Sequence, residues 1–237
     1  MSFGKLYCPS FNGQLYPNAR KILSAAALNS LHLERPEMEF SVTNKTPEYR
    51  AKFPLGKVPG FEGAPPDSSS PPFYLWESDA IAQYVSASGP RRTQLLGGTH
   101  EEKAKIMQWI HFTNCHFSPS VAALAAWRFG LAPFDGKKED SQGEEMARWM
   151  GYLEGQLGAG GGKWLAGTDE VSLADFTLAG LMYLGLIAFM DREYRGGYPN
   201  AMAWMERVRG VEETREIFAG EWIDVKGPAP DADAEKA

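Results

Sequence analysis

The residues best suited to chemistry in this chain form two short motifs that can hold a small peptide. The first is Val58-Pro59, which follows Gly56-Lys57 and opens a short apolar run. Proline has no N–H to give to a sheet, so it belongs at a strand edge or at a first strand position. If the Val58-Pro59 bond is cis, the N–H and C=O of Val58 turn outward and can pair with an extended ligand.

The second motif is Glu77-Ser78. It follows a β-prone apolar run, 74–76, and precedes a run with helical spacing, 80–85, so the pair is predicted to open a helix. The unpaired N–H groups of a helix N-terminus favour an anion, and Ser78 adds a hydroxyl donor. Glu77 suits a ligand ammonium. The pair therefore fits the zwitterionic end of an amino acid.

A strip for peptide backbone and a zwitterion clamp are what glutathione needs, and with these motifs the sequence resembles the cytosolic glutathione transferases. That family has a valine before a cis-proline and a Glu/Gln-Ser pair opening the next helix. The runs TNKTPEYRAKFPLGKVPGFEG and WESDAIAQYVS are similar, almost position by position, to the glutathione-transferase-like domain of the elongation factor 1B gamma subunit. SFGKLY, VSLADFTLAG and YPNAMAWMERV also fit, so the resemblance spans roughly residues 1–226.

The resemblance implies an α/β plus all-α fold. A thioredoxin-like, glutathione-binding N-terminal domain is expected at 1–88, and the family's C-terminal helical bundle at 99–224. The acidic, Pro/Ala-rich residues at 225–237 are expected to form a disordered tail.

Local patterns predict the elements of the N-terminal half. Strands are expected at 5–8 and 33–40, a hairpin at 59–62 with 73–76, and helices at 17–31, 46–52 and 79–86. The loop Pro9–Tyr16 precedes the first helix. The run GAPPDSSSPP at 63–72 is expected to be an exposed, mobile loop, and 88–99 the linker to the second half.

The second half has a helical period. Helices are expected at 101–132, kinked at Pro119, and at 139–157, 202–209 and 212–218, with a flexible break at 158–162. Ser172 and Asp175 are spaced as a capping box, in which each side chain bonds the other residue's backbone N–H. The role expected of this box is in folding, not in chemistry.

The family stabilises the glutathione thiolate with a Tyr, Ser or Cys near the end of the first strand or the start of the first helix. This chain departs from the common versions of that pattern. The loop offers Ser10, Asn12 and Tyr16, with Cys8 at the strand end, and no local rule chooses among them. Each of these side chains could instead simply shape the loop.

Two lysines are the cations expected to reach the glycyl carboxylate. Lys57 directly precedes Val58, and Lys45 stands at the start of the short second helix; similar lysines serve this role in theta-like members of the family. Asn44 is a weaker neighbour. The alternative for both lysines is an ordinary solvated side chain beside a turn.

The pocket for an electrophile is expected against the long helix of the second half. Aromatic residues at helical spacing are core more often than pocket, and a lone histidine is more often structural than an acid or base. The residues proposed to line the pocket are Trp109, Phe112, Thr113, His116 and Phe117.

Composition narrows the class of protein. A net charge of −6 and no Lys/Arg cluster longer than two residues argue against a nucleic-acid surface. The two cysteines, Cys8 and Cys115, give neither a disulfide framework nor metal-ligand spacing, which predicts a cytoplasmic protein with no metal. Apolar runs stay below the ~18 residues of a membrane span.

The sequence is compatible with two functions. In the first, the chain is a glutathione-dependent enzyme, a transferase or a cis/trans isomerase, acting on a small hydrophobic electrophile such as a polyketide-like intermediate of fungal secondary metabolism. In the second, it is a non-catalytic interaction module like the translation factor's gamma subunit. That subunit continues into a second domain whereas this chain stops at Ala237, which favours the enzyme. A homodimer is expected from the family.

Overall fold

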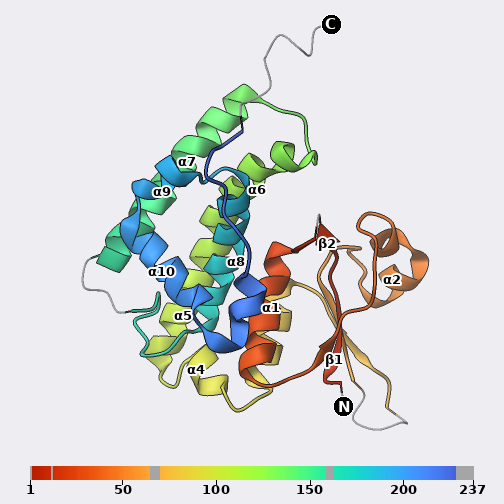
Figure 1. Ribbon diagram of the computed structural model, residues 1–237. Coiled ribbons are helices and arrows are strands. Elements are labelled where there is room, and N and C mark those ends of the chain that lie inside the picture. The colour runs from red at the N-terminus through yellow and green to blue at the C-terminus, as the bar shows by residue number, and fades with distance from the viewer. Residues whose placement is uncertain (1, 12, 65–69, 159–162, 228–237) are drawn as a thin grey trace, which may run out of the picture.

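The computed structural model describes residues 2–11, 13–64, 70–158 and 163–227. A four-stranded sheet lies on one side of the molecule and a large group of helices on the other, with α1 between them (Figure 1). The predicted class, a thioredoxin-like half followed by a helical half, is confirmed. The predicted tail beyond residue 227, and parts of the expected loop at 63–72 and break at 158–162, lie outside the described residues.

The sheet has the strand order β4-β1-β5-β6. The central strand β1 (Gly4–Tyr7) runs parallel to β4 (Leu33–Glu34) and antiparallel to β5 (Gly60–Gly63), which pairs with β6 (Phe73–Leu75). Leu6 opposite Phe61 fills the sheet's buried face, with no exposed surface on either side chain. The hairpin of β5 and β6 is close to the predicted one.

Two details of the predicted strands are wrong. The strand expected at 33–40 ends at Glu34, because Pro36 has no N–H for the ladder and restricts Arg35 before it. The loop before α1 contains a small hairpin that was not predicted, of β2 (Ser10–Phe11) and β3 (Gln14–Leu15). The dipeptide Asn-Gly between the two strands was the sequence signal for it.

The helices of the first half are α1 (Pro17–Leu28), α2 (Pro47–Lys52) and α3 (Ser78–Ala87), with the 3-10 turn η1 (Thr43–Lys45) before α2. Helix α1 packs against α3 on the side of the sheet that faces the helical half, and α2 lies on the far side (Figure 1). Helix α1 ends at Leu28, three residues earlier than predicted, and Ser30 just after it takes a left-handed φ of 54°.

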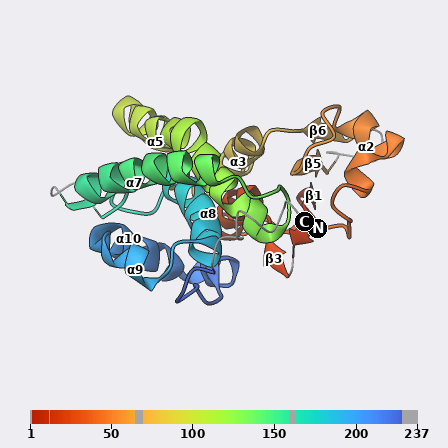
Figure 2. The same ribbon diagram turned by 90° about the horizontal axis from the view of Figure 1, so that it is seen from above.

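The second half is built from helices around the buried helix α8. In chain order they are α4 (Arg92–Leu96), α5 (His100–Phe112), α6 (Ser118–Ala126), α7 (Gly136–Gly158), α8 (Leu173–Ala188), α9 (Arg192–Gly196) and α10 (Pro199–Arg209), with the 3-10 turns η3 (Trp127–Phe129) and η4 (Glu212–Phe218). Figure 2 shows α7 between α5 and α10. Helices α4, inside the expected linker, and α9 were not predicted.

The long helix expected at 101–132 is interrupted. A turn of π-helix, η2 (Thr113–Phe117), separates α5 from α6, directly before the segment that carries Pro119. Proline cannot donate to the carbonyl four residues earlier, so a wider turn at this point avoids a clash. The predicted irregularity is present, but it takes the form of a π turn.

Asp175 anchors the start of α8. Its carboxylate is fully buried and accepts four hydrogen bonds, from the N–H of Leu165 (2.9 Å), the N–H and Oγ of Ser172 (3.0 and 2.9 Å) and Nε1 of Trp204 (2.9 Å). The predicted capping box is therefore confirmed, and it also ties α8 to α10 and to the segment before it.

Replacement of Asp175 by alanine is expected to destabilise the protein by at least about 3 kcal/mol, because several buried donors lose their partner. Urea unfolding followed by tryptophan fluorescence measures the change. Asp140→Ala, at an exposed position of α7, is the control and should shift the midpoint little. Equal midpoints for the two variants would contradict the structural role of Asp175.

Candidate functional site

A cleft of about 460 Å³ opens between the thioredoxin-like sheet's loops and the start of α3. It brings together residues that the sequence places far apart, from η1, from the loop before β5 and from the turn into α3. Seven of the predicted site residues line it: Tyr16, Lys45, Lys57, Val58, Pro59, Glu77 and Ser78.

The Val58-Pro59 peptide bond, whose isomer the sequence left open, is cis. The loop that carries it is fixed from behind by Asn44, whose amide nitrogen donates to the carbonyl of Gly56 (2.7 Å), and by Tyr49, whose hydroxyl donates to the carbonyl of Lys57 (2.8 Å). Sheet pairing of β5 begins at Gly60, so Val58 lies before the ladder, at the wall of the cleft.

Glu77 and Ser78 stand at the N-terminus of α3, as predicted. Ser78 is the first helical residue and is half-buried, and Glu77 is the exposed N-cap with a φ of 67°. A non-glycine residue in this left-handed region carries a backbone cost, and such residues concentrate at functional sites. Glu77 and Ser78, and with them the N-terminus of α3, line the cleft.

The cleft is lined by charged side chains of both signs. Lys45 and Lys57, both exposed, come from η1 and the loop before Val58, whereas Glu77 is the acidic group at the start of α3. A ligand with an anionic group at one end and a zwitterion at the other matches this distribution of charge. Trp76 and Phe40 add apolar surface to the walls.

The three candidates for the thiolate donor have different surroundings. Tyr16 is the N-cap of α1 and lines the cleft; burial raises its pKa, so its phenol stays protonated at neutral pH and can donate a hydrogen bond. Ser10 lies outside the cleft, and its Oγ accepts from Arg35 (3.2 Å). Asn12 lies outside the described residues.

A second groove of about 920 Å³ lies between the β2 hairpin and the segment 35–43. Ser10 and Cys8 line it, and so does Phe40, which also lines the cleft. Burial raises the pKa of the Cys8 thiol, with Arg35 acting in the opposite direction. The groove therefore adjoins the cleft on the side where β1 ends.

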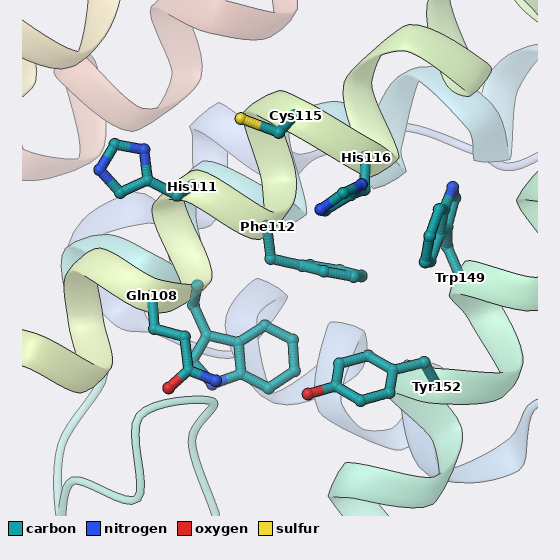
Figure 3. A pocket seen from close by; sticks show the side chains of 8 residues that line it. Gln108, His111, Phe112, Cys115, His116, Trp149 and Tyr152 are labelled. Atoms are coloured by element: carbon teal, nitrogen blue, oxygen red, sulfur yellow. The ribbon is translucent and has the colours of Figure 1, made fainter.

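The aromatic residues predicted to form an electrophile pocket are only partly together. Trp109, Phe112 and His116 line a cavity of about 400 Å³ between α5 and α7. Figure 3 shows the rings of Phe112 and His116 directed toward side chains of α7 across this space, and its α7 wall consists of Trp149 and Tyr152. Among the described residues, this cavity and the cleft have no lining residue in common.

Thr113 and Phe117 are a correction to that prediction. Both side chains are fully buried, and the Thr113 hydroxyl donates to the carbonyl of Trp109 (2.8 Å). Trp109, Thr113 and Phe117 recur every four residues and are all buried, so they lie on the side of this segment that faces the core.

The sequence matches a known family along most of its length. Residues 10–87 match "Glutathione S-transferase, N-terminal domain" and residues 105–212 match "Glutathione S-transferase, C-terminal domain". The chain belongs to the glutathione S-transferase family. The cleft lies in the half that matches the family's N-terminal domain.

The similar proteins include both glutathione S-transferase-like proteins and elongation factor 1-gamma. The glutathione S-transferase-like protein LUC7 of a Fusarium species is 43% identical over 94% of this chain and 97% of its own. Elongation factor 1-gamma-A of Xenopus laevis is 31% identical over 92% of this chain but only 47% of its own. In structure, the GST-like domain of elongation factor 1-gamma from Saccharomyces cerevisiae superposes with a TM-score of 0.77 at 22% identity, covering 98% of this chain and 100% of that one.

Within the described ranges, no three or more His, Cys, Asp and Glu side chains gather in a way that could hold a metal ion. In the same part of the chain, no helix has the length and apolar character to cross a membrane.

Some residues that shape the cleft were missed in the sequence. Phe40, Trp76 and Asn18 line it, and Tyr49 supports it from behind. Trp76 could have been found from its place next to Glu77, but Phe40 comes from a segment that was predicted as a strand. Its position follows from the early end of β4.

Proposed function

We propose that this member of the glutathione S-transferase family is an enzyme that binds glutathione in the cleft and uses its thiolate on a small hydrophobic electrophile. The γ-glutamyl zwitterion is placed at Glu77 and Ser78, and the cysteinyl backbone pairs with Val58. The glycyl carboxylate lies toward Lys45 and Lys57. The observation that supports this is the single cleft lined by all of these residues.

The chemistry requires a lowered thiol pKa. Moving a thiol from a pKa near 8.5 down by about two units requires about 2.7 kcal/mol of preferential thiolate stabilisation. One hydrogen-bond donor and the field of a helix N-terminus are enough to supply this. Tyr16 combines both, since it is a protonated phenol at the start of α1.

We place the electrophile in the groove between the β2 hairpin and the segment 35–43, because it adjoins the cleft through Phe40. The aromatic cavity between α5 and α7 shares no described lining residue with the cleft, so the groove that shares Phe40 is the better candidate. From the resemblance to fungal tailoring enzymes, we propose that the electrophile is polyketide-like. From the cysteine usage, we propose a cytoplasmic location.

Two outcomes follow from the same first step. The thiolate adds to the β-carbon of an activated alkene, forming a C–S bond and moving the alkene's electron pair to the activating group. Protonation of the resulting carbanion gives a conjugate. Alternatively, rotation about the new single bond followed by expulsion of the thiolate restores the alkene with the other geometry and regenerates glutathione.

The competing proposal is a non-catalytic interaction module, and the likeness to elongation factor 1-gamma supports it. Retention on immobilised glutathione, followed by a conjugation assay with a generic electrophile, separates the two. The enzyme is expected to be retained and to conjugate. Retention without turnover would favour the module, and a protein that fails to bind would contradict the proposed cleft function.

Ser78→Ala is expected to weaken glutathione binding by about 1 to 3 kcal/mol, because a desolvated carboxylate loses one donor. Isothermal calorimetry measures the change in Kd. The control is Ser88→Ala, at the other end of α3, where the hydroxyl donates to the carbonyl of Tyr84 (2.7 Å) and lies outside the cleft lining. An unchanged Kd for Ser78→Ala would show that Ser78 begins the helix and has no role in binding glutathione.

Tyr16→Phe is expected to raise the pKa of the bound thiol by about one to two units, because the thiolate loses its donor. The pH profile of thiolate absorbance for bound glutathione is the measurement, with Ser10→Ala and Asn12→Ala compared in parallel. If all three variants kept the wild-type profile, backbone N–H groups alone would stabilise the sulfur, or the thiol would not be activated at all.

A homodimer is proposed from the family. Light scattering at micromolar concentration is expected to give about twice the chain's mass of 26.2 kDa. A single-chain mass at these concentrations would rule the proposal out.

A further inference from the structure

An ion pair between a buried lysine and a half-buried carboxylate lies at the start of α3. Lys21 of α1 is only 2% exposed, and its Nζ is 2.5 Å from Oδ1 of Asp79, the residue directly after Ser78. The other oxygen of Asp79 accepts from Nδ2 of Asn114 (2.7 Å), which belongs to the π turn η2. Three elements, α1, α3 and η2, therefore meet at one carboxylate.

Lys21 is held in an acidic environment. Burial lowers its pKa, and the charge of Asp79, then that of Glu77, acts against this decrease. A buried ammonium without such partners would lose its proton or its position. Glu77 lines the cleft and Lys21 does not, yet the charge of Glu77 also acts on Lys21.

The charge balance at the start of α3 depends on this lysine. Glu77 and Asp79 are carboxylates in the first turn, where an incoming ligand carboxylate is to be held. A helix N-terminus carries roughly half a positive charge, which does not offset two negative ones. With Lys21 paired to Asp79, only Glu77 remains uncompensated, and the ligand's own ammonium neutralises it.

We propose that Lys21, through Asp79, is a positioning residue that makes the start of α3 selective for a thiol peptide with an intact α-carboxylate at its γ-glutamyl end. Asn114 holds Asp79 from the helical half, so this recognition also depends on how the two halves of the protein dock. The proposal rests on the proposed function, because it concerns the ligand assigned to the same cleft.

The test compares two ligands, glutathione and 4-aminobutanoyl-cysteinyl-glycine, which lacks only the α-carboxylate. Wild type is expected to prefer glutathione. Lys21→Met, which fills the buried space without the charge, is expected to weaken glutathione binding roughly 10- to 100-fold and binding of the analogue less than about threefold. Lys21→Met/Asp79→Asn, which removes both charges, is expected to restore most of the preference.

Two further variants keep the test decisive. Asn114→Ala removes one partner of Asp79 without altering a buried cation, and a smaller loss of preference in the same direction is expected even if Lys21→Met does not fold. The control is Lys52→Met, which breaks the 2.7 Å pair of Lys52 with Glu62 in the same half of the protein and should leave the preference unchanged. Calorimetry gives both Kd values, and urea unfolding reports folding.

The outcomes separate this inference from the proposed function. Equal weakening of both ligands by Lys21→Met, with the preference intact, would reduce Lys21 to a folding role and overturn the inference. Equal binding of the two ligands by wild type would also overturn it, while leaving glutathione binding in place. Failure of wild type to bind either ligand would overturn the proposed function and the inference with it.

Discussion

The packing of α1 between the sheet and α8 is the constraint on which the site depends. Gly180 of α8 approaches α1 so closely that a Cβ there would come within 2.8 Å of the carbonyl oxygen of Pro17. One turn on, the buried Arg20 donates to the carbonyl of Ile217 and stacks over the ring of Tyr183, 3.7 Å from its centroid. Because α1 begins at the cleft, these contacts with the helical half fix the position of its N-terminus and of Tyr16.

The parts of the fold that the sequence predicts are those with a local physical cause. The Ser172 box could be predicted because a cap is complete within four residues, whereas at Val58-Pro59 the proline only makes a cis bond possible and the sequence left the isomer open. The short hairpin of β2 and β3 also had a local signal, although it was not used. The end of β4 was missed because Pro36 was taken to make 33–40 an edge strand, whereas it ends the strand.

The candidate site divides in the same way. The motifs Val58-Pro59 and Glu77-Ser78 depend on neighbouring residues and were found. The residues expected to line an electrophile pocket were inferred from helical spacing, which does not distinguish core from pocket. Thr113 and Phe117 show this, since they share the helical spacing of Trp109 but are fully buried in the core. The pairing of Lys21 with Asp79 joins positions 58 residues apart, and nothing local in the sequence announces it.

The two unusual features next to the cleft are hard to explain by folding alone. Glu77 in a left-handed conformation costs on the order of 1 to 3 kcal/mol. The Lys21–Asp79 pair takes a lysine out of water, and such a pair contributes little net stability compared with apolar residues of the same size. A non-catalytic module with this fold would be at least as stable without either. Both features lie at the start of α3, whose first residues line the cleft, and a bound zwitterionic ligand would give each of them a use. Their coincidence therefore favours a protein that still binds glutathione over one that retains only the fold.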